Sequence, residues 1–165
     1  MTAAGYKPRS FLCGENRMRF KTEDEIYEVL RAFERATIAR EDWKHAEHLA
    51  VALVYTAELG EAAALEKMRS GIINLLEHGF GLDLTKEMPY HETLTVFWIR
   101  VVAEFNAAND GVSLLEKANE LIETHDKDLP LRFYSRELLF SDAARAEFLP
   151  PDGKNQLKWR VEKVF

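Results

Sequence analysis

The stretch that decides the fold class is residues 61–81, which read EAAALEKMRSGIINLLEHGFG. Its apolar residues recur every three or four positions, the spacing that places side chains on one face of an α-helix. This stripe consists of Leu65, Met68, Ile72, Leu75 and Leu76. Gly79 and Gly81 come after it, where glycine commonly ends a helix. The stretch therefore predicts a helix over residues 61–78 that buries one face.

Helical signals continue along most of the chain. Two pairs have the spacing of a capping box, in which each side chain bonds a backbone amide at the helix start: Thr22 with Glu25, and Ser113 with Glu116. Pro89 suits the first turn of a helix, because the N–H that it lacks would have no partner there. Further helices are predicted over residues 22–38, 40–59, 89–108 and 113–124, with a short one over residues 141–148.

No strand-like alternation of apolar and polar residues interrupts residues 22–126. Residues 1–21 are expected to form an irregular N-terminal arm, and residues 149–165 a C-terminal tail. We therefore predict an all-α, single-domain helical bundle over residues 1–165, with four to five main helices and short C-terminal elements.

Composition and charge exclude several classes of protein. A chain of 165 residues with 47% hydrophobic and 30% charged residues is typical of one globular domain. Its net charge of -6 opposes a broad nucleic-acid interface. The longest apolar run, Leu49–Tyr55, is far shorter than the ~20 residues that span a bilayer. Cys13 is the only cysteine, and residues 1–10 lack a signal-peptide pattern. We expect a cytoplasmic protein without nucleic-acid or membrane partners, and the sequence leaves a homo-oligomer open.

The sharpest local signal is the histidine pair in Trp43-Lys44-His45-Ala46-Glu47-His48-Leu49. Residues three apart share a helix face, so His45 and His48 are expected to point the same way. Rotation by about 100° per residue places Leu49 and Ala52 on that face, which directs the pair toward neighbouring helices. Two neutral imidazoles at this spacing can bind one divalent metal ion. The simpler interpretation is two hydrogen-bonded histidines inside the bundle or at its rim.

A third histidine, in Tyr90-His91-Glu92-Thr93-Leu94-Thr95, is predicted on the inward face of the helix over residues 89–108. His45, His48 and His91 would be a sufficient ligand set for a metal ion with open coordination positions. Glu92 is the candidate fourth ligand, or the general base beside a metal-bound water. Its simpler interpretation is a favourable interaction with the helix dipole.

Arg69 lies on the apolar face of the helix over residues 61–78. A buried guanidinium needs a partner, because an unpaired buried charge costs several kcal/mol. The candidates are a carboxylate such as Glu92 or Glu41, or an acidic substrate. Alternatively, the stem of Arg69 covers apolar surface while its head reaches water. The predicted substrate-binding residues are Arg69, Tyr90 and Thr95.

Three motifs resemble those of an uncharacterised family of small bacterial all-helical proteins: Trp43-x-His45-x-x-His48-Leu49, Met68-Arg69-x-Gly71-Ile72 and Tyr90-His91-Glu92-Thr93-x-Thr95. The resemblance covers residues 40–100. It implies that the three segments work together, and it implies no particular activity. Helical bundles of the DinB type hold a metal ion with three histidines from two helices, and this chain is similar in ligand type but not in spacing.

These observations favour a metal-binding helical bundle that holds one zinc or iron ion. A metal-dependent hydrolase or oxygenase acting on a small molecule is then the reaction class within reach. Two alternatives stay open. One is a metal-free protein that binds a small acid through Arg69 and the histidines. The other is a non-catalytic interaction module with structural histidines and an interface of exposed aromatic residues, Trp43, Phe133, Tyr134 and Phe140.

Overall fold

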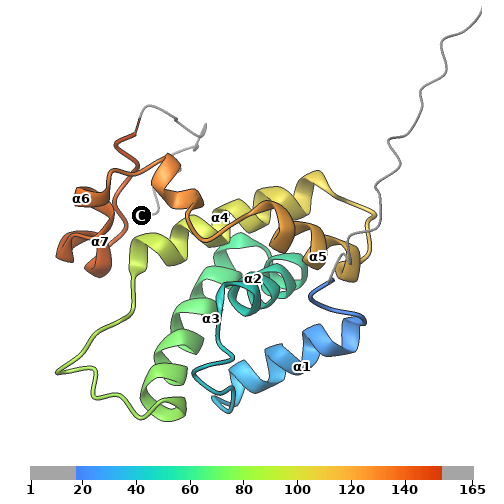
Figure 1. Ribbon diagram of the computed structural model, residues 1–165, viewed down its shortest axis with the longest axis horizontal. Helices are drawn as coiled ribbons and strands as arrows, with labels where there is room; N and C mark the ends of the chain where they lie inside the picture. Colours follow the sequence, from blue (N-terminus) through green and yellow to red (C-terminus); the bar gives the residue numbers. More distant parts are fainter. Residues whose placement is uncertain (1–17, 154–165) are drawn as a thin grey trace, which may run out of the picture.

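The structure is a computed structural model that describes residues 18–153. Most of it is a bundle of helices (Figure 1). The main helices are α1 (Glu23–Glu34), α2 (His45–Leu59), α3 (Glu61–Asn74), α4 (Glu92–Ala108) and α5 (Leu114–Thr124). A π-helical turn, Leu75–Gly79, continues α3, and short elements follow α5: a 3-10 helix (Leu129–Arg132), α6 (Arg136–Leu139) and α7 (Asp142–Ala146). The described residues contain no β-strand, which confirms the predicted all-α class. The parts of the expected arm and tail at residues 1–17 and 154–165, with Cys13, lie outside the described residues.

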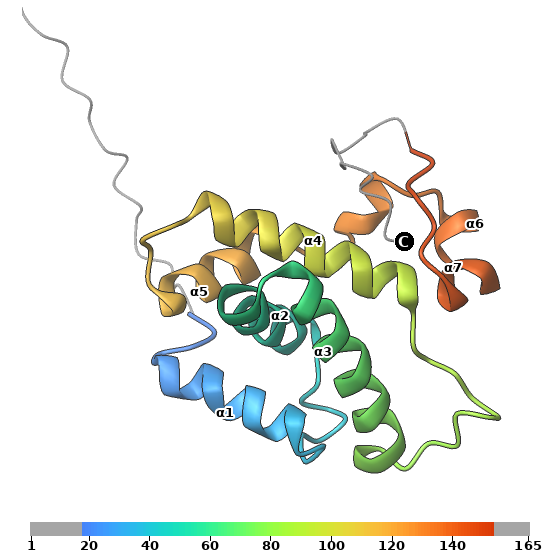
Figure 2. The same ribbon diagram turned by 180° about the vertical axis from the view of Figure 1, so that it is seen from behind.

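Helix α2 is central and contacts α1, α3, α4 and α5 (Figure 1 and Figure 2). Every residue from Leu49 to Thr56 is buried, so this part of the helix is enclosed on all sides. A helix can be buried in this way when it is apolar around its whole circumference. The two hydroxyls in this run are satisfied, since Thr56 donates to Leu53 O and Tyr55 donates to Glu34 on α1. No helix formed by residues 18–153 is long and apolar enough to cross a membrane.

The connection between α1 and α2 is longer than predicted. Helix α1 ends at Glu34 instead of residue 38, because Ala36 adopts a left-handed backbone (φ 54°) that an α-helix does not contain. Helix α2 begins at His45 instead of residue 40. Trp43 therefore lies before the helix, where its ring stacks on Phe33 of α1 at 4.8 Å between centroids.

Helix α4 begins at Glu92, and Pro89 lies before it instead of in its first turn. The N-cap is His91, whose Nδ1 accepts the Leu94 N–H at 3.2 Å. Histidine is not among the residues usually preferred at this position, so the sequence pattern pointed to the proline instead. The caps predicted for α1 and α5 are confirmed by the hydroxyls of Thr22 and Ser113, each of which accepts the amide N–H three residues on.

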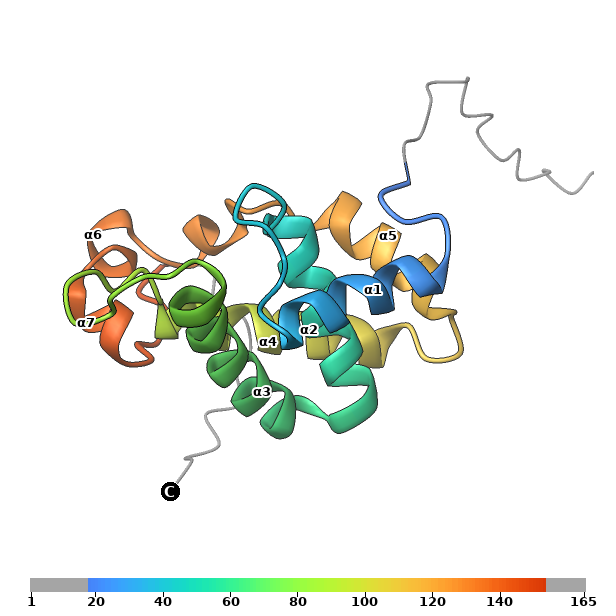
Figure 3. The same cartoon turned by 90° about the horizontal axis from the view of Figure 1, so that it is seen from below.

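The C-terminal elements pack on the first turns of α4, at the end of the molecule away from α1 (Figure 3). Thr93, which is fully buried, donates from Oγ1 to Glu147 O and accepts from Leu149 N. The Tyr134 hydroxyl donates to Leu149 O at 2.8 Å. Tyr134 is therefore a core residue, and it was wrongly expected among the exposed aromatics of an interface. Within that group, Phe140 is the one that is largely exposed, and Trp43 and Phe133 are half-buried.

We predict that Gly71→Ala lowers the free energy of unfolding by about 1–2 kcal/mol, as overpacking of a core usually does. A Cβ atom at position 71 would lie well inside van der Waals contact with Cε1 and Cζ of Phe33. That ring is fully buried and stacked on Trp43, so it has little room to move. Helix propensity alone would favour alanine by ~1 kcal/mol, and the steric cost has to exceed this gain.

Urea unfolding of the two proteins measures the change, and Ser70→Ala is the matched control at the neighbouring exposed position of α3. The control should leave stability within about 0.5 kcal/mol of the parent value. A Gly71→Ala protein more stable than the parent would contradict the argument, because it would mean that the Phe33 ring moves aside without cost.

Candidate functional site

A cavity of about 370 Å³ lies between α2, α3 and α4, beside the segment that precedes α4. Its volume falls in the usual range for small-molecule sites, about 300–1,000 Å³. Apolar side chains form most of the wall: Trp43, Leu49, Ala52, Met68, Ile72, Pro89, Leu94, Trp98 and Ile99. The polar side chains that line it are Lys44, His45, His48, Tyr90, His91, Thr95 and Lys127. The structure thus brings the three predicted histidines, Tyr90 and Thr95 to one cavity.

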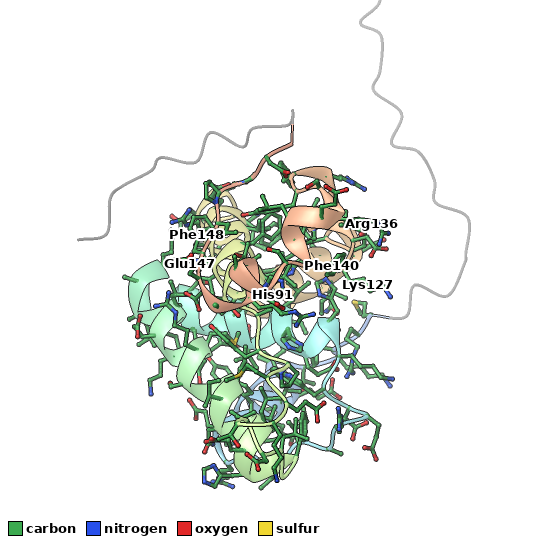
Figure 4. All side chains as sticks on the ribbon, turned by 90° about the vertical axis from the view of Figure 1, so that its left-hand side faces the viewer. His91, Lys127, Arg136, Phe140, Glu147 and Phe148 are labelled. Carbon is green, nitrogen blue, oxygen red and sulfur yellow. The ribbon has the colours of Figure 1, made fainter. Side chains whose placement is uncertain are left out.

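Both ring nitrogens of His91 are engaged. Nδ1 caps α4 through the Leu94 N–H, and Nε2 lies 2.6 Å from Leu139 O at the end of α6. A carbonyl oxygen can only accept, so Nε2 carries the hydrogen and the imidazole is neutral. Burial lowers the pKa of His91; the bond to Leu139 O opposes this shift, and the charge of Arg145 adds to it. Figure 4 shows His91 beneath the C-terminal helices, which its side chain ties to α4.

His45 and His48 each use one ring nitrogen in the same manner. His45 Nε2 donates to His125 O at the end of α5 (2.7 Å), and His48 Nδ1 donates to Lys44 O (2.8 Å). In the neutral rings, Nδ1 of His45 and Nε2 of His48 are therefore acceptors. Neither of these two nitrogens has a hydrogen-bond partner within residues 18–153. Burial lowers the pKa of His48, and the bond to Lys44 O opposes this shift only in part.

Each of these two histidines packs against a tryptophan of the cavity wall. The His48 ring lies over Trp43 with 4.0 Å between centroids, and the His45 ring meets Trp98 edge to face at 4.7 Å. Trp43 is held in turn by its stacking on Phe33. The imidazoles are thus fixed both by a backbone carbonyl and by an aromatic neighbour.

Glu92 lies beside the cavity and not in its wall, in an ion pair with Arg69. Arg69 Nε donates to Oε1 at 2.9 Å and to Oε2 at 3.1 Å, and the Tyr90 hydroxyl donates to Oε2 at 2.6 Å. Arg69 also pairs with Glu66. Burial raises the pKa of Glu92, but the bonds from Arg69 and Tyr90 outweigh burial and hold this pKa below its usual value. The partner of Arg69 is Glu92 and not Glu41, and the ion pair fixes Tyr90 at the cavity.

The predicted metal site is not assembled among residues 18–153, where no three His, Cys, Asp or Glu side chains form a group that could hold a metal ion. His91 has no nitrogen left for a metal, and both carboxylate oxygens of Glu92 already accept hydrogen bonds. The nitrogens that remain are His45 Nδ1 and His48 Nε2. Metal binding by this chain stays a prediction.

The hydroxyls of Tyr90 and Thr95 also direct their hydrogens away from the cavity. Tyr90 donates to Glu92, and Thr95 Oγ1 donates to the backbone carbonyl of His91 at 2.9 Å. A hydroxyl has one hydrogen to donate and two lone pairs, so each oxygen retains only accepting capacity. Together with the open nitrogens of His45 and His48, they make the inner part of the cavity neutral and rich in acceptors.

Lys44 and Lys127 line the exposed side of the cavity, which we call its mouth. Neither ammonium forms an ion pair within residues 18–153, and no Asp or Glu in that range lines the cavity. The mouth is thus locally positive in a chain of net charge -6. Sequence reasoning missed both residues. Lys127 reaches the cavity because the chain after α5 folds back over α2, and no spacing pattern relates it to residues 43–48.

Comparison with known proteins gave no match: no family model fits the chain, and no curated protein and no solved structure is significantly similar to it. The resemblance carried by the three motifs stays a prediction. Inferences about function therefore rest on the geometry of the cavity.

We predict that Arg69 and Glu92 stabilise the fold jointly, with a coupling energy of about 1–2 kcal/mol. This value lies between those of exposed and buried ion pairs, since the Arg69 side chain is 35% exposed and that of Glu92 is 12% exposed. Urea unfolding of Arg69→Met, Glu92→Gln and the double variant gives the coupling energy from a double-mutant cycle.

The same cycle on Asp83 and Lys86 is the matched control, because that pair lies in an exposed connection, with the Lys86 side chain 82% exposed. Its coupling energy should be close to zero. Additive effects at Arg69 and Glu92 would contradict the structural role assigned to their ion pair.

We predict that the protein loses stability as the pH falls from about 7.5 to about 5.5. The pKa values of His48, His91 and His125 are lowered in the folded state, chiefly by burial. The unfolded chain, in which histidine titrates near pH ~6.5, then binds more protons than the folded chain. This contribution to stability is full above that pH and decreases below it, by at most about 1.4 kcal/mol per pH unit for each histidine.

His91→Asn tests the share of His91 in this pH dependence. Asparagine can still cap α4, and it does not titrate. Urea unfolding at about pH 7.5, 6.5 and 5.5 should show a shallower loss of stability in this variant than in the parent. Equal slopes would mean that His91 contributes nothing to the pH dependence.

Proposed function

We propose that this protein binds a small organic acid with an apolar body in the cavity between α2, α3 and α4, without a metal ion. The observation that carries the proposal is the charge at the cavity: within residues 18–153, Lys44 and Lys127 at its mouth have no ion-pair partner, and no carboxylate lines it. A carboxylate placed between two ammonium groups gains both charge attraction and hydrogen bonds. With this function we retain the sequence-based expectations of a cytoplasmic location and of no nucleic-acid partner.

The cavity wall supports an apolar, and preferably aromatic, body for the ligand. A cavity of about 150 Å³ is enough to hold a benzene ring, and this one measures about 370 Å³. Trp98 supplies aromatic surface, as does the part of Trp43 that Phe33 and His48 leave uncovered, and the other apolar residues of the wall are aliphatic. Aromatic side chains of this kind favour stacked or edge-to-face partners beyond simple burial. The volume leaves room for a ring with polar substituents at both ends.

The hydrogen bonds of the histidines favour the metal-free form of the proposal. Each imidazole at the cavity gives its N–H to a backbone carbonyl, as structural histidines do. Arg69, which the sequence suggested as the partner of the acid, is already paired with Glu92 and Glu66. The acid therefore takes the lysines as its partners. A metal-binding function is the second candidate, and what favours it is the pair of open nitrogens on His45 and His48.

The test uses phenylacetate and its uncharged amide, phenylacetamide, as probes. Titrations followed by amide ¹H–¹⁵N spectra should show phenylacetate binding, with the largest shifts at cavity residues such as Ala52 and Thr95, and weaker binding of the amide. Lys44→Gln and Lys127→Gln should each weaken phenylacetate binding about 2–10-fold, the range expected for a partly exposed ion pair. Lys67→Gln, at an exposed position of α3 outside the cavity, is the matched control and should bind like the parent.

Two results would contradict the proposal. One is that neither probe shifts the cavity residues at millimolar concentration. The other is that phenylacetate binds only after Zn²⁺ or Fe²⁺ has been added, with about one equivalent of metal retained per chain. This second result would establish the metal-binding candidate instead.

A further inference from the structure

The inner part of the cavity has an unusual balance of hydrogen-bonding groups. Four polar side chains reach it besides His91, namely His45, His48, Tyr90 and Thr95. Each of them donates its N–H or O–H to another group of the protein. His45, His48 and Thr95 donate to backbone carbonyls, and Tyr90 donates to the Glu92 carboxylate. What they offer to a ligand is therefore accepting capacity alone. A ligand that fits this end has to bring a hydrogen of its own.

His48 is the acceptor that is placed best for this purpose. Its Nδ1 is bound to Lys44 O, one turn back in the chain, so Nε2 is on the opposite side of the ring. The ring face is covered by Trp43 at 4.0 Å, which leaves the edge that carries Nε2 for a ligand. The Lys44 carbonyl keeps the hydrogen on Nδ1, because a carbonyl oxygen cannot donate one. Nε2 is thus held as an acceptor before any ligand arrives.

We infer that the ligand is a phenolic acid: an aromatic carboxylic acid with a hydroxyl group at the far end of its ring, which donates to His48 Nε2. The inference rests on the proposed function, which accounts for the carboxylate at the mouth. It adds the chemistry of the opposite end of the ligand. His48 is then the residue that sets specificity for the hydroxyl group.

A neutral donor suits this end better than a charged one. An ammonium group would lose its hydration on entering, and no carboxylate of residues 18–153 lines the cavity to replace that hydration. It would also be repelled by Lys44 and Lys127 at the mouth. A phenol titrates near pH ~10, so it stays neutral and keeps its hydrogen at physiological pH. Its ring can pack against Trp43 and Trp98 while its hydroxyl reaches the imidazole.

The hydroxyl should matter to affinity because an acceptor without a partner is costly. Water can satisfy Nε2 in the empty cavity, and a ligand displaces that water when it fills the space. A ligand without a donor leaves Nε2 unpaired, whereas a phenol restores the bond. We expect this difference to amount to about tenfold in the dissociation constant.

The experiment compares 4-hydroxyphenylacetate with 4-methoxyphenylacetate and phenylacetate on the full chain. The methoxy compound keeps the ring, the carboxylate and the oxygen on the ring, and a methyl group replaces the hydrogen that the hydroxy compound donates. Phenylacetate lacks the hydroxyl group without this added bulk. Calorimetric titration should give a dissociation constant for the hydroxy compound about tenfold lower than that for the methoxy compound. Equal affinities in the parent protein would overturn the inference, and phenylacetate binding at the cavity would still uphold the proposed function.

The variant that isolates His48 is His48→Phe, which keeps a flat ring against Trp43 and removes both nitrogens. It should bind the hydroxy and methoxy compounds with equal affinity. His78→Phe, at an exposed position away from the cavity, is the matched control and should keep the tenfold preference. A preference that persists in His48→Phe would overturn the role of His48.

A spectroscopic measurement does not depend on the folding of any variant. Long-range ¹H–¹⁵N spectra of the imidazoles in the parent protein report which nitrogen of each ring carries hydrogen. The hydroxy compound should move the ¹⁵N signal of the unprotonated Nε2 of His48, and the methoxy compound should leave it in place. A His48 signal with hydrogen on Nε2, or an Nε2 signal that both compounds leave unchanged, would overturn the inference.

Discussion

The N–H group of His91, given to the carbonyl of Leu139, joins the start of α4 to the end of α6. The other nitrogen of the same ring accepts the Leu94 N–H and sets where α4 begins. Because α4 forms one side of the cavity, its starting point decides where Tyr90 and Thr95 are placed. The bond also fills an acceptor at the end of a helix, where carbonyl groups have no partner within the helix itself. One neutral imidazole therefore couples a helix start, the docking of the C-terminal elements and the shape of the site.

Two other histidines repeat this arrangement with a different consequence. His45 donates to the carbonyl of His125 at the end of α5, and His48 donates to that of Lys44, the N-cap of α2. Each lines the cavity and, unlike His91, has one ring nitrogen without a hydrogen-bond partner in residues 18–153. The backbone thus determines the tautomer, and the tautomer determines what a ligand can bond to. Because the backbone fixes the tautomers, the inner part of such a cavity can select a ligand that donates a hydrogen bond, although its own side chains have no hydrogen free to donate.

The sequence predicted the helices well because burial leaves a periodic pattern that a single chain displays, as in the stripe from Leu65 to Leu76 in and just beyond α3. It placed the start of α4 wrongly because the cap there is a histidine, which no local rule favours. It named Glu92 as one possible partner of Arg69, beside Glu41, an acidic substrate and an arginine whose head reaches water. It did not find Lys127, because that residue lines the cavity only through the path that the chain takes after α5, where His125 O accepts from His45. A single sequence therefore predicts helices, and it does not predict which distant segments come into contact.

The expectation of a metal site shows where such reasoning stops. Helical spacing correctly brought His45, His48 and His91 to one cavity, since the direction of a side chain follows from its position on a helix. Whether a nitrogen is available to a ligand depends on which carbonyl lies behind the ring, and that is decided by tertiary packing. Leu139 and His125 are remote from these histidines in the chain. The positions of the histidines in the sequence predicted that they line one cavity. The hydrogen bonds of their rings determine which nitrogens a ligand can reach.

The proposed site for an anion is compatible with a net charge of -6, because two electrostatic effects of different range are involved. Repulsion from carboxylates spread over the surface acts at distances comparable to the Debye length, about 8 Å at physiological salt, and is largely screened. Contact with Lys44 and Lys127 acts over a few ångströms, where little salt intervenes. Net charge therefore governs solubility and the approach of partners, while affinity is set by the charges that line the cavity.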